Sequence, residues 1–174
     1  GKTVLLKCIC GFLKPDQGHI QVLGQDIGKD CDFAPNTGIL IETPGFLSSE
    51  SAYNNLRWLA ELRGKSIVAR DNNVLTAVGL DPSSKKHVGK FSLGMRQRLG
   101  IAQALLDDPE LIILDEPMNA LDRQGVADMH KIFLELRAKG KTILLASHYM
   151  QDIDTLCDDV YEMDQGTITK YVKI

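Results

Sequence analysis

Apolar residues follow two different spacings along this chain, and the two spacings alternate. Unbroken aliphatic runs at 38–42 (GILIE), 111–114 (LIIL) and 142–146 (TILLA) predict short strands, of which the first two are expected to be buried. Between the second and third runs, apolar residues recur three and four positions apart, which predicts a helix over 126–139 that ends before Gly140. Strand, helix and strand in this order predict a parallel sheet with a functional site at the carboxyl ends of its strands.

The middle third of the chain shows the helical spacing alone. From Ser51 to Leu106 the apolar residues are placed to line one helix face after another. We therefore expect an α/β core formed by residues 1–45 and 107–174, with residues 46–106 inserted as an α-helical subdomain.

The two ends of the chain carry shorter elements. A helix is expected after Thr3 that stops near Gly11, and a short strand is expected at 19–24. The last segment, 159–172, predicts a hairpin that turns at 164–166 (DQG).

Composition narrows the class of protein. The 174 residues, 44% hydrophobic and 25% charged, are typical of a globular domain. A net charge of −3 provides no basic stripe for nucleic acid, and no apolar run approaches the roughly 20 residues that span a bilayer. Since the cysteines lack metal-binding spacing, reduced thiols are expected at Cys8, Cys10, Cys31 and Cys157.

Two acidic residues close the strongest strand. Asp115 and Glu116 follow LIIL directly, and neighbouring side chains of a strand point to opposite faces, so the two acids should have different tasks. In P-loop enzymes the first acid of such a pair holds Mg²⁺ and the second orients or deprotonates the attacking water. The chain opens on Gly1, Lys2 and Thr3, the last three residues of a P-loop pattern. Taken alone, the acidic pair could instead be a solvated turn, and the three opening residues could match the P-loop pattern by chance.

A third segment, FSLGMRQRLGIAQALL at 91–106, is a polar turn that opens a helix. Ser92 and Gly94 stand at its start, where free N–H groups and the helix dipole attract a phosphate, although Ser92 could equally be only an N-cap. The segment resembles the signature of ABC ATPases (LSGGQ-x-QR), with a Walker B strand at the usual distance. The match consists of Ser92, Gly94, Gln97 and Arg98, and the departures are Phe91, Leu93 and Met95.

Other elements of an ABC ATP-binding domain follow in order. Residues 119–122 (NALD) resemble the D-loop, and Ser147 with His148 resembles the H-switch, whose histidine contacts the γ-phosphate. Glu42 stands where the family usually has glutamine, and a glutamate at this position resembles the ATPase subunits of bacitracin- and lantibiotic-type exporters. Alternatively, Glu42 is an ordinary acid at the end of a strand. The remaining histidines lack such context and are expected on the surface: His19, His87 and His130.

The resemblance covers the whole chain and implies an α/β P-loop NTPase fold with an inserted helical subdomain. It implies ATP and Mg²⁺ as cofactors. The implied roles are nucleotide binding by Gly1, Lys2, Thr3, Ser92, Gly94 and Asp122, metal binding by Thr3, Glu42 and Asp115, and hydrolysis by Glu116 and His148.

The resemblance also implies partners. These are a transmembrane permease, which would place the chain at the cytoplasmic face of the cell membrane, and a second ATPase subunit facing it head to tail. Ser92 and Gly94 of one copy would then close on the nucleotide of the other, and no nucleic acid is expected.

The implied transporter subunit has two alternatives. A soluble ABC protein acting on ribosomes or DNA would predict a basic insertion or CxxC pairs, and neither occurs in these residues. A non-catalytic nucleotide-gated module would have lost Glu116 or Lys2, and both are present. Since the P-loop pattern begins before Gly1, we also expect the front of the domain to lie outside this sequence.

Overall fold

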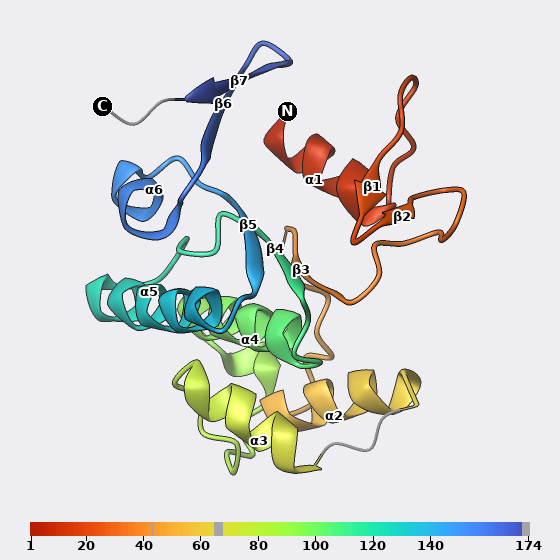
Figure 1. Ribbon diagram of the computed structural model, residues 1–174. Helices are drawn as coiled ribbons and strands as arrows, with labels where there is room; N and C mark the ends of the chain where they lie inside the picture. Colours follow the sequence, from red (N-terminus) through yellow and green to blue (C-terminus); the bar gives the residue numbers. More distant parts are fainter. Residues whose placement is uncertain (43, 65–67, 172–174) are drawn as a thin grey trace.

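A parallel sheet lies at the centre of the computed structural model, which describes residues 1–42, 44–64 and 68–171 (Figure 1). Its strands are β3 (Thr37–Leu40), β4 (Leu111–Asp115) and β5 (Thr142–Ala146), in the order β3-β4-β5. The aliphatic run of β4 is fully buried because it is the central strand, with a neighbour on each side. The predicted parallel sheet is confirmed.

Helices cover both faces of this sheet. Ile112 and Leu114 of β4 share an apolar core with α4 (Leu93–Leu105) and α5 (Arg123–Ala138). Leu111 and Ile113 point the other way and pack with Leu6 of α1 (Lys2–Cys10). This alternation follows from the two-residue period of a strand, and Figure 1 shows α1 on the side of the sheet away from α4 and α5.

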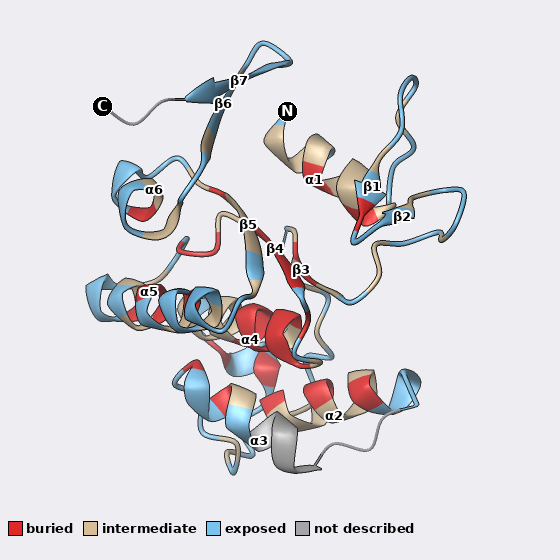
Figure 2. Cartoon of the chain, viewed as in Figure 1, coloured by how far each residue is buried: buried red, intermediate tan, exposed pale blue. Residues whose placement is uncertain are grey.

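The predicted helical stretch contains α2 (Ala52–Leu62), α3 (Val68–Ala77), the 3₁₀ turn η1 (Val88–Lys90) and α4. Leu56 of α2 and Leu75 of α3 are buried in the same apolar core as α4 and α5. Figure 2 shows buried residues gathered along β4 and α4. The domain boundaries given above remain predictions.

Smaller elements complete the chain. They are the hairpin β1 (Gln21–Val22) and β2 (Gln25–Asp26), the helix α6 (Met150–Leu156), and the antiparallel pair β6 (Val160–Asp164) and β7 (Thr167–Tyr171). Gly11 and Gly140 have φ of 87° and 81°, so both follow their helices in the left-handed conformation expected of a terminating glycine. The predicted final hairpin is confirmed. In the described residues, no helix has the length and hydropathy needed to cross a membrane.

The strand boundaries differ from the prediction in one informative place. GILIE was expected to be a strand to position 42, but β3 ends at Leu40, and Glu42 has a φ of 61°. This residue therefore lies on the turn beyond the strand. The cysteines are free thiols, and burial raises the pKa of Cys10 to about 11, which leaves its thiol protonated at neutral pH.

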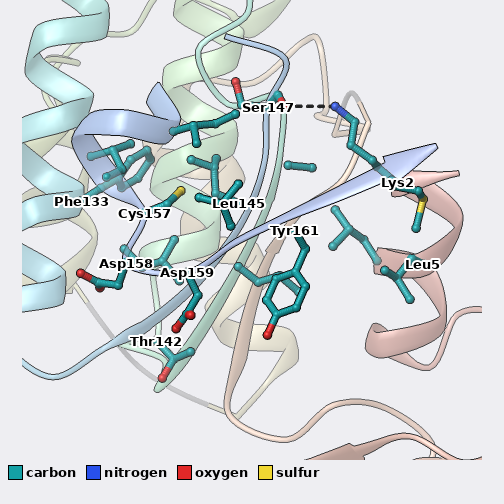
Figure 3. A pocket seen from close by; sticks show the side chains of 18 of the residues that line it. Lys2, Leu5, Phe133, Thr142, Leu145, Ser147, Cys157, Asp158, Asp159 and Tyr161 are labelled. Carbon is teal, nitrogen blue, oxygen red and sulfur yellow. Dashed lines mark hydrogen bonds between the residues drawn. The ribbon is translucent and has the colours of Figure 1, made fainter. Parts of the chain in front are cut away.

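The strand β5 is less buried than β4. Only Ala146 is buried among its residues, because β5 pairs with β4 on one side and lines a cavity of about 490 Å³ with its other side. Figure 3 shows Leu5 and Lys2 of α1 across this cavity from Leu145 and Ser147. The upper rim of the cavity therefore borders the region where the strands end.

Candidate functional site

The carboxyl end of β4 and the start of α1 meet in space. The Thr3 hydroxyl donates to Asp115 Oδ2 at 2.6 Å, and Lys2 Nζ donates to Glu116 Oε1 at 3.1 Å. The partners are 112 and 114 positions apart in the sequence. Asp115, the last residue of β4, and Glu116, on the turn that follows it, thus serve different partners.

Glu116 also contacts His148, which comes two residues after the end of β5. His148 Nδ1 lies 2.8 Å from Glu116 Oε2, and since an ionised carboxylate only accepts, Nδ1 carries the proton of this hydrogen bond. Each carboxylate oxygen of Glu116 therefore has a basic partner.

The surroundings of Glu116 favour its charged form. Burial alone would raise the pKa of its carboxyl, but the hydrogen bonds from His148 and Lys2, with their positive charges, hold the pKa below its ordinary value. At neutral pH the group is an ionised hydrogen-bond acceptor, which is the form needed to orient water or accept a proton.

The backbone at Glu116 is strained. Its φ is 49°, a left-handed conformation that costs a non-glycine residue about 1–3 kcal/mol. The Glu116 N–H donates to Ala146 O at 2.8 Å, and Gln97 Nε2 of α4 donates to Pro117 O at 2.9 Å. These bonds stabilise the turn, so the signature helix and β5 together place Glu116.

Lys2 spans the mouth of the cavity beside β5. Besides Glu116, its Nζ donates to the Ser147 carbonyl at 3.2 Å, the dashed contact in Figure 3. Gly1 precedes α1, and its carbonyl accepts from Leu5 N at 3.1 Å to begin the helix. The predicted P-loop residues therefore lie at a helix N-terminus beside the acids, as phosphate binding requires.

Thr3 and Asp115 bring a hydroxyl and a carboxylate together, which suits Mg²⁺, because proteins usually hold this ion by one or two carboxylates with substrate phosphates and several waters. Glu42 is directed elsewhere: it is exposed, and its Oε1 accepts from Lys7 Nζ at 2.6 Å. No group of three or more His, Cys, Asp and Glu side chains suited to a metal occurs within the described ranges. The metal-binding role of Glu42 remains a prediction.

The signature and D-loop residues have local tasks in this chain. Ser92 Oγ accepts from Met95 N at 3.2 Å, and Asp122 Oδ1 accepts from Gly125 N at 2.8 Å, so each caps the helix that it precedes. A Cβ on Gly94 would lie 2.8 Å from Ala120 O, so only glycine lets these two segments approach. The capping does not test the predicted nucleotide-binding role of these residues.

One histidine prediction is wrong. His19 and His87 are exposed as expected, but His130 is buried, with Nε2 2.8 Å from Asp152 Oδ1. The signal for burial was present, because His130 lies four positions after Val126 on the apolar face of α5. Asp152 was missed because no motif surrounds it.

Known proteins share these features. The family described as ABC transporter matches residues 1–119. The uncharacterized ABC transporter ATP-binding protein YybJ of Bacillus subtilis (strain 168) is 40% identical over 177 residues, which cover 100% of this chain and 80% of YybJ. The bacitracin transport ATP-binding protein BcrA of Bacillus licheniformis is 38% identical over 174 residues, which cover 99% of this chain but only 57% of BcrA.

Solved structures agree. CbiO1 from Clostridium perfringens, part of the ABC transporter complex cbiONQ, matches with a TM-score of 0.76 and 28% identity, covering 97% of this chain and 71% of that one. The ATP-binding cassette MJ0796, in a dimeric post-hydrolysis state with ADP and Pi, matches with a TM-score of 0.83 over 100% of this chain and 82% of its own; at 18% identity it shows the fold alone.

These matches define the class as an α/β P-loop ATPase, which confirms the predicted fold. The chain belongs to the ABC transporter family, and its matched relatives are ATP-binding proteins. Members of this class bind ATP and are ATPases.

Proposed function

We propose that this chain binds ATP with Mg²⁺ and hydrolyses it to drive a membrane transporter. The observation that carries the proposal is the position of Glu116 between Lys2 and His148, beside the Thr3–Asp115 pair. A lysine, a metal-type oxygen pair and a residue that positions water are groups that phosphoryl transfer uses in P-loop enzymes, and the resemblance to ABC ATPases implies the histidine.

Lys2 links nucleotide binding to the availability of Glu116. Its ammonium now donates to Glu116 and to Ser147 O, and the phosphates of ATP would compete for the same charge. Withdrawal of Lys2 removes two of the influences that lower the pKa of Glu116, so the carboxylate becomes a stronger base. Phosphate binding thus prepares Glu116 to accept a proton.

The hydrolytic step follows from these placements. Glu116 orients a water and takes its proton as the water oxygen attacks the γ-phosphorus, and the bond to the ADP oxygen breaks. His148, on the other side of Glu116, donates to a γ-phosphate oxygen. Gly1, Lys2 and Thr3 bind the phosphates at the start of α1. Thr3 and Asp115 would hold Mg²⁺, which neutralises phosphate charge when bound.

A second copy would complete the site. Ser92 is exposed at the start of α4, and Gly94 and Asp122 flank the same turn region, so these residues can face a nucleotide on another subunit. The ground for this head-to-tail assembly is the membership of the chain in the ABC transporter family. If it forms, Ser92→Arg should keep a hydrolysis-blocked, ATP-bound protein monomeric in size-exclusion chromatography; normal dimerisation would contradict the head-to-tail arrangement.

Export through a membrane permease is the transport role that the relatives favour. The bacitracin-transport proteins are similar over nearly the whole chain, and cbiO1 is part of a transporter complex. The chain spans 57% of those bacitracin-transport relatives, so their activity as whole proteins is a guide only. We propose an exporter of peptides or drugs, with this chain at the cytoplasmic face of the membrane.

The decisive experiment compares two glutamates of one strand region. In the full-length protein, Glu116→Gln should lower ATP turnover about 10²–10⁴-fold while ATP binding persists, the usual contribution of a positioned base. Glu110→Gln, exposed just before β4, is the matched control and should retain parental turnover. Parental turnover in Glu116→Gln would overturn the proposed hydrolytic role.

A further inference from the structure

A buried carboxylate lies directly behind the proposed hydrolytic histidine. Asp152 of α6 is 2% exposed, and both of its oxygens are used: Oδ1 accepts from His130 Nε2 at 2.8 Å and Oδ2 accepts from the Ser147 hydroxyl at 2.9 Å. A buried charge is tolerated only when paired and hydrogen-bonded in this way. The network therefore joins α5, α6 and the end of β5.

The Ser147 hydroxyl passes this constraint to the backbone around His148. The hydroxyl donates its proton to Asp152, so the lone pairs of Ser147 Oγ point toward the backbone of Tyr149. The Tyr149 N–H donates to Ser147 Oγ at 3.1 Å. A serine hydroxyl that accepts from the amide two residues on closes a local turn. His148 is the residue inside that turn.

His148 has little other support. Its side chain is 57% exposed, and the ring it packs against, with centroids 4.1 Å apart, belongs to Tyr149, the residue whose amide closes the same turn. The turn over residues 147–149 thus sets where Nδ1 points, and in this structure it points to Glu116 Oε2.

We propose that Asp152, paired with His130, is a positioning residue that acts through Ser147 to hold His148 in line with Glu116. The inference rests on the proposed hydrolytic role of Glu116 and His148. A displacement of about 1 Å at a reacting group can cost about 100-fold in rate, so a small loosening of this turn should be visible in turnover.

Two variants test the proposal in the full-length protein. Ser147→Ala removes only the connecting hydroxyl and should lower kcat for ATP about 10-fold, while Asp152→Ala should lower it about 10–100-fold. In both variants KM for ATP should stay within about threefold, because the phosphate-binding residues are untouched. Ser147→Thr keeps the hydroxyl and should recover most of the loss.

The molecule offers a matched control. Arg137 of α5 pairs with Asp158, just beyond α6, at 3.3 Å on the surface. Asp158→Ala therefore removes an acid that also links α5 to α6, but at the end remote from Ser147. It should turn over ATP at the parental rate.

A double-mutant cycle separates positioning from general structural damage. If Asp152 acts through His148, then Ser147→Ala and Asp152→Ala should change kcat less than about threefold when His148 is already alanine. If Ser147→Ala and Asp152→Ala lower kcat as much in the His148→Ala background as in the parent, the proposal is overturned. It is also overturned if both single variants keep the parental kcat while His148→Ala has a reduced kcat. Parental kcat in His148→Ala itself would instead overturn the hydrolytic role of His148, and the positioning role with it.

Discussion

Two histidine–carboxylate pairs flank the end of β5, and they differ in almost everything except distance. His148 with Glu116 and His130 with Asp152 both have nitrogen and oxygen 2.8 Å apart. The side chains of the first pair are 57% and 22% exposed, and those of the second are 11% and 3% exposed. Ser147 lies between the pairs and is bonded to the inner one.

The difference in burial assigns the pairs different work. An exposed pair contributes little to stability, because water competes for both partners, so a ligand can replace either partner at low cost. A buried pair is costly to break, because each partner left behind is a desolvated polar group. The outer pair can therefore take part in chemistry, whereas the inner pair maintains the shape on which that chemistry depends.

The largest effect should follow from breaking the outer pair. His148→Ala should lower ATP turnover in the full-length protein about 10²–10³-fold, the contribution of one positioned hydrogen-bond donor to the charge that develops on the phosphate. Its free energy of unfolding should change by less than about 1 kcal/mol, because the hydrogen bond to Glu116 is exposed to water. Phosphate-release kinetics and urea denaturation of the same preparation measure both quantities. A large loss of stability would show that the outer pair is structural.

Breaking the inner pair should lower stability more than breaking the outer pair does, and turnover less. Asp152→Ala leaves His130 and the Ser147 hydroxyl without their buried acceptor, and we expect the free energy of unfolding to fall by about 3–5 kcal/mol. Urea denaturation, with Asp158→Ala as the exposed control, measures the loss. A change below about 1 kcal/mol in Asp152→Ala would mean that water replaces the carboxylate without cost.

Glu116 and His148 were expected at the site from the sequence, whereas His130 and Asp152 were not, for a physical reason. Glu116 follows an aliphatic run, and His148 follows another, so local patterns place both at strand ends of one sheet edge. His130 and Asp152 are 22 positions apart on two helices, and no local spacing announces that pairing. The helical period alone would have predicted that His130 is buried. A buried histidine needs a hydrogen-bond partner, however, and the period gives no information about which residue that is.

Glu42 is a second case in which the sequence did not predict a side-chain contact. The resemblance implied a metal ligand at Glu42, a role that remains a prediction, and in this structure its side chain pairs with Lys7, 35 positions away. Strand ends are local properties, whereas the direction of a side chain on a turn depends on which charges the fold brings near. The parallel sheet and the acids that follow its LIIL strand were predicted from the sequence; the strand order and the contacts made by turn residues were not.

A double substitution sharpens the comparison by separating stability from positioning. His130→Met with Asp152→Leu replaces the inner pair by apolar groups, and such replacements are often neutral in stability when they pack well. We expect most of the 3–5 kcal/mol lost in Asp152→Ala, about 2 kcal/mol or more, to return. Turnover should remain about 10-fold low, because Ser147 still lacks its acceptor. Restored turnover would show that rigidity of the helices alone supports His148.

The smallest effect concerns the response of the outer pair to acid. The folded-state pKa of Glu116 lies below its ordinary value of 4.5, because the hydrogen bonds and charges of His148 and Lys2 outweigh burial. A carboxyl whose pKa is lowered on folding stabilises the protein fully above pH 4.5, and this stabilisation disappears as the pH falls through the folded-state pKa. Glu116→Gln cannot titrate, so its free energy of unfolding should fall less steeply than that of the parent below pH 4.5, by no more than about 1 kcal/mol. Urea denaturation of both proteins between pH 7 and the acid limit of folding measures the slopes, with Glu110→Gln as the control. Parallel slopes for all three proteins would mean that Lys2 and His148 do not stabilise the ionised form of Glu116, and the electrostatic account of the outer pair would be wrong.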